Sequence, residues 1–249
     1  MESNNPNYTY DSVVQLDDSE TASRKYLAKV FAWMFVALGI SAFFALEFYS
    51  NSALTSAILV PATDGTGYVG FTGLGYICVF APLAFSLVMS FGFNRISYPV
   101  MVFLLLAYSA TIGISLSVLG FEYTAGSIFG VFLSAAVVFG VMAITGYTTS
   151  MDLSKFGSII YMIFIGAFVA SLVNFFIGSA QLDYIISFIF IAVMVGLTAY
   201  YMQMLKRIGA GIEYGNEQSK KLVIIGAFIL YTTFINLFIS MMRIFGRRR

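Results

Sequence analysis

Polar side chains with the spacing of one helix face lie in the last apolar stretch of the chain. Thr233, Asn236 and Ser240 recur at helical spacing and Thr232 adjoins them, so on a helix they form one stripe. Hydroxyl and amide groups in such a stripe can line a water-filled path through a membrane. They can equally hydrogen-bond to neighbouring helices, which is the commoner role. The pattern leaves both roles open.

Two amides and a set of carboxylates are the other candidates for chemistry. Asn174 and Gln203 lie within apolar stretches and could extend a polar lining. Carboxylates at the ends of apolar stretches could form an electronegative vestibule that concentrates cations, or could be acids tolerated in loops. These carboxylates are Glu47, Asp64, Glu122 and Asp183.

Several functional classes are disfavoured by the residues that are missing from the sequence. The chain has no histidine and one cysteine, Cys78, so the usual zinc, haem and Ser-His-Asp sites have no imidazole and no intrachain disulfide can form. No lysine lies between Leu222 and Met242 to hold a retinal, and no basic stripe suits nucleic acid. We expect neither catalysis, nor a metal site, nor a cofactor.

The elements that position these residues must be membrane helices. The chain has 249 residues, of which 59% are hydrophobic and 10% charged, with a mean hydropathy of +0.89. Soluble domains carry about 25% charged residues, and a surplus of apolar surface this large is stable only with lipid as the solvent. A helix that crosses the bilayer needs about 20 apolar residues. Seven stretches satisfy this length: residues 26–48, 70–92, 99–119, 124–147, 156–177, 184–205 and 222–242.

Lysine and arginine lie in alternate loops, which predicts the orientation. They flank the first stretch and recur in the second, fourth and sixth loops, whereas the other loops contain only acids. The amino terminus is therefore predicted to be cytosolic. The seventh stretch breaks the rule, because a full crossing puts Arg243 and 247–249 on the far side. The sequence leaves the side of the carboxyl terminus open.

The domain organisation that follows is simple. Residues 1–24 are polar and acidic and are predicted to form a disordered tail. Residues 25–246 form one seven-helix transmembrane domain, and 247–249 form a short basic tail. Gly126 and Gly130, which are small residues at helical spacing, are predicted to mark close helix packing.

Four groups of residues together resemble the Bax inhibitor-1 family of multi-pass membrane proteins, and its bacterial branch in particular. The resemblance runs from Arg24 to Gly246 and rests on the order and spacing of these groups. They are Thr145-Gly146-Tyr147-Thr148-Thr149 with Asp152, Ser171-Leu172-Val173-Asn174-Phe175-Phe176, Gly196-Leu197-Thr198-Ala199-Tyr200 with Gln203, and Phe234-Ile235-Asn236-Leu237-Phe238.

The resemblance implies an all-α fold in which the last helix is surrounded by two layers of three helices. It also implies a pH-sensitive calcium leak, protection against stress-induced cell death in eukaryotic members, and binding to a membrane protease in bacteria. The expected location is a bacterial cytoplasmic membrane.

Two positions depart from the family pattern. Members with the leak mechanism have one aspartate after a tyrosine in the sixth helix and another in the seventh; Tyr201 and Thr233 occupy these positions here. A close carboxylate pair shares a proton because two like charges at short range cannot both ionise. A phenol beside a hydroxyl cannot titrate in this way. We therefore expect any calcium leak to lack the family's pH response.

Two main hypotheses remain at this point. One is a calcium or other cation leak without its pH sensor. The other is an interaction protein that modulates a membrane protease or a stress response. A small-molecule transporter is a third and weaker possibility, because the sequence contains no repeat.

Overall fold

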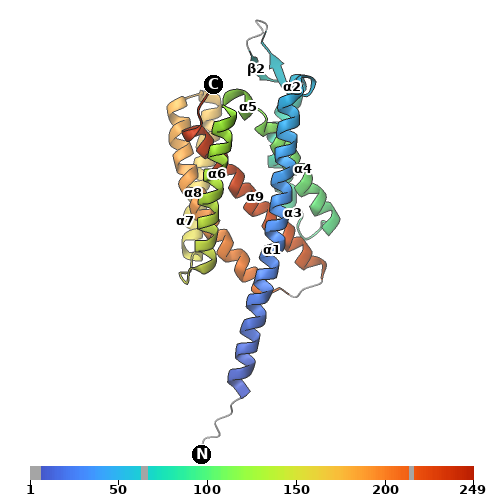
Figure 1. The fold of residues 1–249 in the computed structure, drawn as a ribbon, viewed down its shortest axis with the longest axis vertical. Coiled ribbons are helices and arrows are strands. Elements are labelled where there is room, and N and C mark those ends of the chain that lie inside the picture. Colours follow the sequence, from blue (N-terminus) through green and yellow to red (C-terminus); the bar gives the residue numbers. More distant parts are fainter. Residues whose placement is uncertain (1–6, 63–66, 213–215) are drawn as a thin grey trace, which may run out of the picture.

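A computed structural model of the chain describes residues 7–62, 67–212 and 216–249, with side-chain surroundings from Ser19 onward. The described residues are almost entirely helical (Figure 1). The elements are α1 (Asn7–Ser50), α2 (Ser52–Ile58), β1 (Leu59–Pro61), β2 (Tyr68–Phe71), α3 (Gly73–Gly92), α4 (Tyr98–Leu116), α5 (Leu119–Glu122), α6 (Ala125–Thr148), α7 (Ser154–Ile177), α8 (Ala180–Ala210) and α9 (Glu217–Phe245).

Seven of these helices are long and apolar enough to cross a membrane, which confirms the predicted number. Polar caps set several of their first residues: Thr72, Ser179 and Asn216 each accept a hydrogen bond from a backbone N–H of the first turn of α3, α8 and α9. Gly178 ends α7 with a φ of 70°, a left-handed conformation that glycine adopts without strain.

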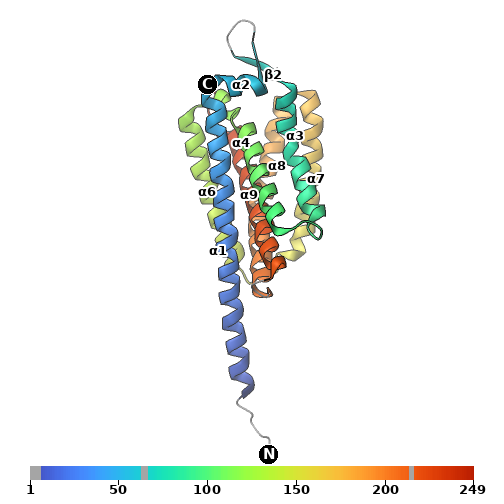
Figure 2. The same cartoon turned by 90° about the vertical axis from the view of Figure 1, so that its right-hand side faces the viewer.

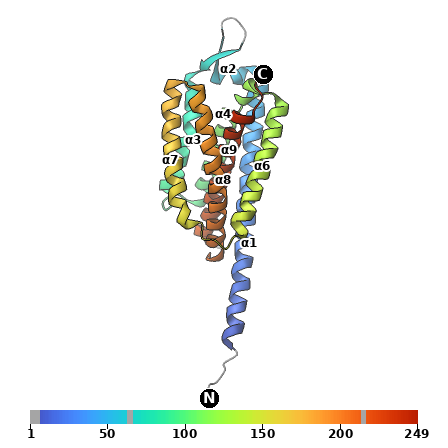
Figure 3. The same ribbon diagram turned by 90° about the vertical axis from the view of Figure 1, so that its left-hand side faces the viewer.

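Helix α9 forms the centre of the bundle, as predicted. It packs against α1 and α4 on one side and against α6 and α8 on the other, while α3 and α7 lie at the outer edges of the two layers (Figures 2 and 3). In α9, 61% of the most apolar segment is buried, against 17% in α3 and 11% in α7. The edge helices therefore leave most of their apolar surface to the bilayer.

The amino-terminal segment differs from the predicted disordered tail. From Asn7 onward the residues before 25 continue α1 as helix, which projects beyond the bundle (Figure 1). The Ser23 hydroxyl donates to the carbonyl of Lys206 at 3.0 Å, and the Tyr26 hydroxyl donates to that of Leu222 at 2.9 Å. These bonds fix α1 to the ends of α8 and α9, and a helix already nucleated in the membrane extends at little further cost.

The two ends of the bundle are built differently. The start of α1 at Asn7 lies at one end, whereas the carboxyl terminus lies at the other with α2, α5 and the antiparallel β1–β2 hairpin (Figure 1). Helix α9 therefore runs through the whole bundle. Asp64, one of the predicted vestibule residues, lies outside the described residues.

The prediction of close packing at Gly126 and Gly130 was wrong. A Cβ added at either position would meet no neighbouring atom. Close approaches lie elsewhere: a Cβ at Gly113 would collide with the backbone of Ser41, and one at Gly146 with the backbone of Ala199. Helical spacing of small residues alone does not reveal which helix face meets a neighbour.

Candidate functional site

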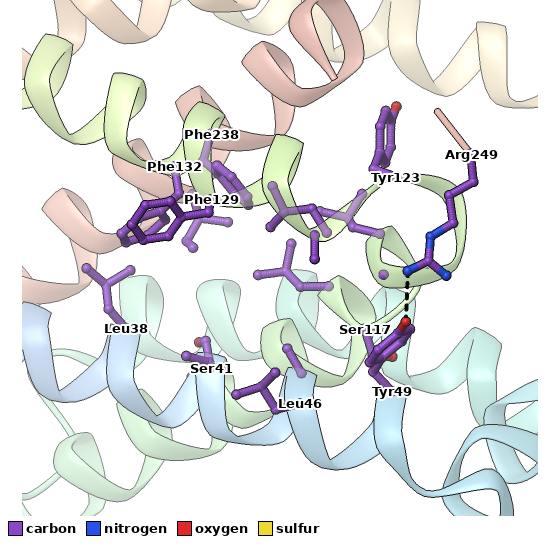
Figure 4. A pocket seen from close by; sticks show the side chains of 18 residues that line it. Leu38, Ser41, Leu46, Tyr49, Ser117, Tyr123, Phe129, Phe132, Phe238 and Arg249 are labelled. Atoms are coloured by element: carbon purple, nitrogen blue, oxygen red, sulfur yellow. Dashed lines mark hydrogen bonds between the residues drawn. The ribbon is translucent and has the colours of Figure 1, made fainter. Parts of the chain in front are cut away.

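A cavity of about 460 Å³ lies between α1 and α6, in the half of the bundle nearer the carboxyl terminus (Figure 4). Its walls are almost wholly apolar, and α1, α4, α5, α6, α9 and the last residue of the chain contribute to them. The lining residues are Leu38, Ser41, Ala42, Ala45, Leu46, Tyr49, Leu116, Ser117, Leu119, Gly120, Tyr123, Ala125, Ile128, Phe129, Phe132, Ile235, Phe238 and Arg249.

A buried polar centre adjoins the inner end of this cavity. The Ser41 hydroxyl lies 2.7 Å from the carbonyl of Ser109 on α4 and 3.1 Å from that of Ala37 in its own helix, and it also contacts the hydroxyl of Tyr231 on α9. A serine hydroxyl has one proton to donate, so when it donates to a carbonyl, the Tyr231 hydroxyl donates to Ser41. Ser41, Ser109 and Tyr231 are buried, and their bonds join α1, α4 and α9.

Sequence reasoning missed this polar centre. Gly113 makes it possible, because the absence of a side chain there lets α1 approach α4 closely enough for Ser41 to reach Ser109. Tyr108 extends the centre, since its hydroxyl lies 3.3 Å from that of Thr232 on α9. An isolated serine in an apolar stretch gives no signal that distinguishes such a junction from a residue bonded to its own helix.

The last residues of the chain lie at the outer end of the cavity. The Arg249 guanidinium donates to the Tyr49 hydroxyl at 3.1 Å (Figure 4). The backbone of the tail is bonded as well: the N–H of Arg249 donates to the carbonyl of Glu122, and the N–H of Thr124 donates to that of Arg247. The basic tail is thus part of the folded bundle.

The three described candidates for an acidic vestibule lie at this same end, and arginines lie beside two of them, Asp183 and Glu122. Asp183 accepts a hydrogen bond of 2.8 Å from Arg243, and Glu122 and Glu47 lie at the end of α5 and in the last turn of α1. Arginine partners reduce the negative potential that these acids would otherwise produce. Attraction of cations to this end stays a prediction.

Gln203 forms a clamp at the opposite end of the bundle. Its amide donates to the carbonyl of Met151 at 2.8 Å and accepts from the N–H of Leu153 at 2.9 Å, which fixes the α6–α7 loop to α8. Beside it, Arg207 donates to Asp152 at 2.7 Å. The hydrogen bond from Arg207, with that from the Ser154 backbone, lowers the pKa of Asp152 below its usual value.

The same clamp explains two of the sequence motifs. Lys206 donates to the carbonyl of Tyr147 at 2.9 Å, and its ammonium lies 4.5 Å from the centre of that ring. At the residue before Tyr147, the close contact between Gly146 and Ala199 brings α6 and α8 together. The motif residues at these positions hold helices to one another.

Most of the other polar lining candidates bond locally. Asn174 bonds through its amide to both backbone groups of Ser179 and so closes the α7–α8 turn. The Ser240 hydroxyl donates to the carbonyl of Asn236 within α9. Asn236 itself is partly buried. Of the stripe, Ser240 therefore bonds within its own helix, whereas Thr232 contacts the Tyr108 hydroxyl of α4. Both roles of the stripe, helix packing and a permeation lining, stay predictions.

Tyr201 and Thr233 occupy the two expected sensor positions without a carboxylate. Thr233 is buried, and its hydroxyl donates to the carbonyl of Ile229 at 2.8 Å. Tyr201 is partly buried on α8, where its ring lies 5.4 Å from that of Tyr200 and its hydroxyl faces Tyr161 of α7. Both positions are neutral.

A second cavity of about 450 Å³ opens at the clamp end, between α1, α4 and α9. It is basic in character and is lined by Tyr26, Lys29, Trp33, Tyr98, Ile212, Ser219, Lys220 and Val223. Among the described residues no group of three or more His, Cys, Asp or Glu is placed to hold a metal ion.

Comparison with known proteins agrees with this architecture. A family model described as "Inhibitor of apoptosis-promoting Bax1" matches residues 23–249. The chain is 40% identical to the inner membrane protein YbhL of Escherichia coli over 96% of this chain and 97% of that protein. It is 37% identical to a protein of Rickettsia prowazekii over 91% of each chain. It is also 34% identical to a membrane protein of Streptococcus pyogenes over 92% of this chain and 95% of the relative. With six apolar helices arranged around a central seventh, the chain belongs to the Bax inhibitor-1 family of multi-pass membrane proteins.

Proposed function

We propose that this protein is an interaction protein of the bacterial inner membrane that keeps its helix bundle closed and does not conduct calcium under proton control. The observation that carries the proposal is the neutral, hydrogen-bonded middle of the bundle. Ser41, Ser109 and Tyr231 join three helices there, and Tyr201 and Thr233 occupy the sensor positions. The inner membrane location is supported by the relative YbhL.

The charges at the two cavities support the same conclusion. Arg249 lies at the mouth of the first cavity, and Lys29 and Lys220 line the second. A fixed positive charge at each entrance raises the energy of a divalent cation there. A path through these cavities would therefore exclude calcium more readily than it would admit it.

Calcium flux tests the first part of the proposal. The full chain in liposomes loaded with a calcium indicator should give the flux of empty liposomes at every pH from 6 to 8. The double variant Tyr201→Asp, Thr233→Asp restores the carboxylate pair, and Tyr201→Asn, Thr233→Asn is its neutral control of matched size. A pH-dependent flux in the aspartate variant alone would show that only the sensor is missing. A steep pH-dependent flux through the unmodified protein would overturn the proposal.

The projecting part of α1 is the surface that we assign to a membrane partner, such as a membrane protease. Helix α1 begins at Asn7 and bonds to α8 at Ser23, about 24 Å further along the helix, and its first part projects beyond the bundle (Figure 1). Crosslinking in native membranes from positions 8–18 should capture one partner, at a fixed ratio of partner to this protein. Excess peptide of residues 1–24 should compete for that partner. Capture that is undiminished by this excess peptide would refute the assignment.

A cation leak is the second candidate, and one observation favours it. The two cavities lie at opposite ends of the bundle and both adjoin α1 and α9, with packed apolar side chains such as Met34 and Leu230 between them. A hydrophobic constriction between two wider spaces is a recognised form of channel gate. A pH-independent flux above that of empty liposomes in the same assay would favour this candidate.

A further inference from the structure

The cavity between α1 and α6 faces the bilayer on its open side. Helices α1 and α6 both pack against α9, and the cavity separates them from each other in the half of the bundle nearer the carboxyl terminus (Figure 4). Leu46 and Phe129 on its rim are 66% and 69% exposed. Apolar side chains this exposed on a transmembrane helix contact lipid tails, so the opening leads into the hydrocarbon and not into water.

The dimensions of the cavity match one leaflet. From Leu38 to Tyr49 the lining follows α1 for about 16 Å, given the rise of a helix. This length is about half of the ~30 Å hydrocarbon core. The volume, about 460 Å³, lies within the ~300–1,000 Å³ typical of pockets that bury a small ligand.

The charge at the mouth is complementary to a phosphate. Arg249 lines the outer end of the cavity, and Arg247 and Arg248 precede it in a tail held by backbone bonds. A guanidinium has five N–H donors, and the Tyr49 hydroxyl accepts one from Arg249. The remaining donors suit the oxygens of a phosphate at the level of the headgroups. Glu122 and Asp183 are acids near this tail, and both interact with Arg248.

From this geometry we infer that the cavity between α1 and α6 binds one acyl chain of an anionic phospholipid, with the lipid phosphate on Arg249. The acyl chain enters sideways between Leu46 and Phe129 and reaches the level of Ser41. The phosphate stays at the interface beside Tyr49 and the basic tail. The site is separate from the projecting part of α1 that the proposed function uses.

Native mass spectrometry of the full chain tests this inference. The protein is reconstituted in bilayers of equal parts phosphatidylglycerol and phosphatidylcholine, extracted in mild detergent and weighed with its retained lipids. We expect one phosphatidylglycerol retained in preference to phosphatidylcholine. Arg249→Gln should reduce that preference about fivefold, as expected for one interfacial arginine. Arg95→Gln, a change in a loop at the other end, is the matched control and should retain the preference.

A second pair of variants tests the cavity itself. Ala45→Phe places a ring inside the cavity and should reduce retention of either lipid about tenfold, the effect of displacing about two methylene groups. Ala84→Phe is the control, because Ala84 is exposed on α3 and does not line the cavity. Equal retention in the two alanine variants would mean that the lipid is only annular, and would overturn the inference. Equal retention of the two lipids by the unmodified protein would overturn the role of Arg249.

Discussion

The two residues of the Ser41–Tyr231 hydrogen bond should differ in how much their substitution lowers the free energy of unfolding. If Ser41 donates to the Ser109 carbonyl and accepts from Tyr231, then Ser41→Ala leaves a buried tyrosine hydroxyl without its acceptor. Leaving a buried donor unsatisfied costs about 1–3 kcal/mol. Tyr231→Phe removes the hydroxyl itself, so no donor stays buried without an acceptor. Its cost should be nearer the ~0.6 kcal/mol average for hydrogen bonds between membrane helices. Ser41→Ala should therefore lower the free energy of unfolding more than Tyr231→Phe does.

Reversible unfolding in bicelles, followed by the fluorescence of the single tryptophan, Trp33, measures this difference. Ser134→Ala is the control, because Ser134 is exposed and bonds only within its own helix in the described contacts. An equal loss for Ser41→Ala and Tyr231→Phe would show that the donor assignment is wrong.

At this scale the sequence identified polar residues better than it identified their partners. Asn174 and Gln203 were predicted as candidates for a polar lining, and in the structure their amides close a turn and clamp a loop. Ser41 was not singled out, although it connects three helices. Hydrogen-bond partners in a bundle depend on helix rotation and depth, and neither is encoded in the spacing within one helix.

The contact between α6 and α8 depends on the lack of a side chain at Gly146. A Cβ there would overlap the backbone of Ala199, which cannot move as a flexible side chain can. Gly146→Ala should therefore lower the unfolding free energy by about 1–3 kcal/mol, the usual cost of overpacking. Gly130→Ala is the matched control: its Cβ meets open space, and alanine favours helix by up to ~1 kcal/mol. In the same unfolding assay, Gly146→Ala should be less stable than the unmodified protein and Gly130→Ala should be more stable. A change of the same sign in both variants would contradict the close packing at Gly146.

The clamp between α8 and the α6–α7 loop should stabilise the protein less as the pH falls. Hydrogen bonds from Arg207 and the Ser154 backbone lower the pKa of Asp152 in the folded protein. A carboxyl group with a depressed folded pKa stabilises the fold above its unfolded pKa of about 3.9, and loses this effect as the pH falls through the folded value.

Asp152→Asn tests the clamp, with thermal unfolding measured between pH 3 and 7. The variant should be less stable than the unmodified protein near pH 7, and the two curves should converge at the acid end. Arg207→Gln removes the guanidinium that lowers the pKa, and should flatten the same part of the profile. A constant difference across the range would show that the Asp152 charge does not contribute.

Element by element, the seven membrane helices could be predicted because their apolar length is set by the bilayer alone. The ends of α1 and α8 could not, since both extend beyond the membrane into segments held by contacts such as that of Ser23 with Lys206. The β1–β2 hairpin was also missed. It is short, and its strands lie in a loop whose sequence resembles a linker more than alternating strands.

Over the whole molecule, the arginines at the carboxyl terminus break the pattern of basic residues in alternate loops. The start of α1 and the carboxyl terminus lie at opposite ends of the bundle, so seven crossings put them on opposite sides of the membrane (Figure 1). Lysine and arginine in alternate loops predict a cytosolic amino terminus. The carboxyl-terminal arginines then lie on the far side, where the Asp183–Arg243 pair and the backbone bonds of the tail hold them.

Reporter fusions test this topology in cells. Alkaline phosphatase, which folds only outside the cytosol, should be active when it is fused after Arg249 and inactive when it is fused before Met1. Green fluorescent protein does not fluoresce when the general secretion route exports it unfolded. It should therefore fluoresce when it is fused before Met1 and stay dark when it is fused after Arg249. Each reporter fused within the loop that contains Arg95, between α3 and α4, should match the amino-terminal result, because both are expected in the cytosol. Reporters that place both termini on one side would contradict seven crossings, whereas an exchange of the two sides would preserve the fold and overturn only the orientation predicted from the basic loops.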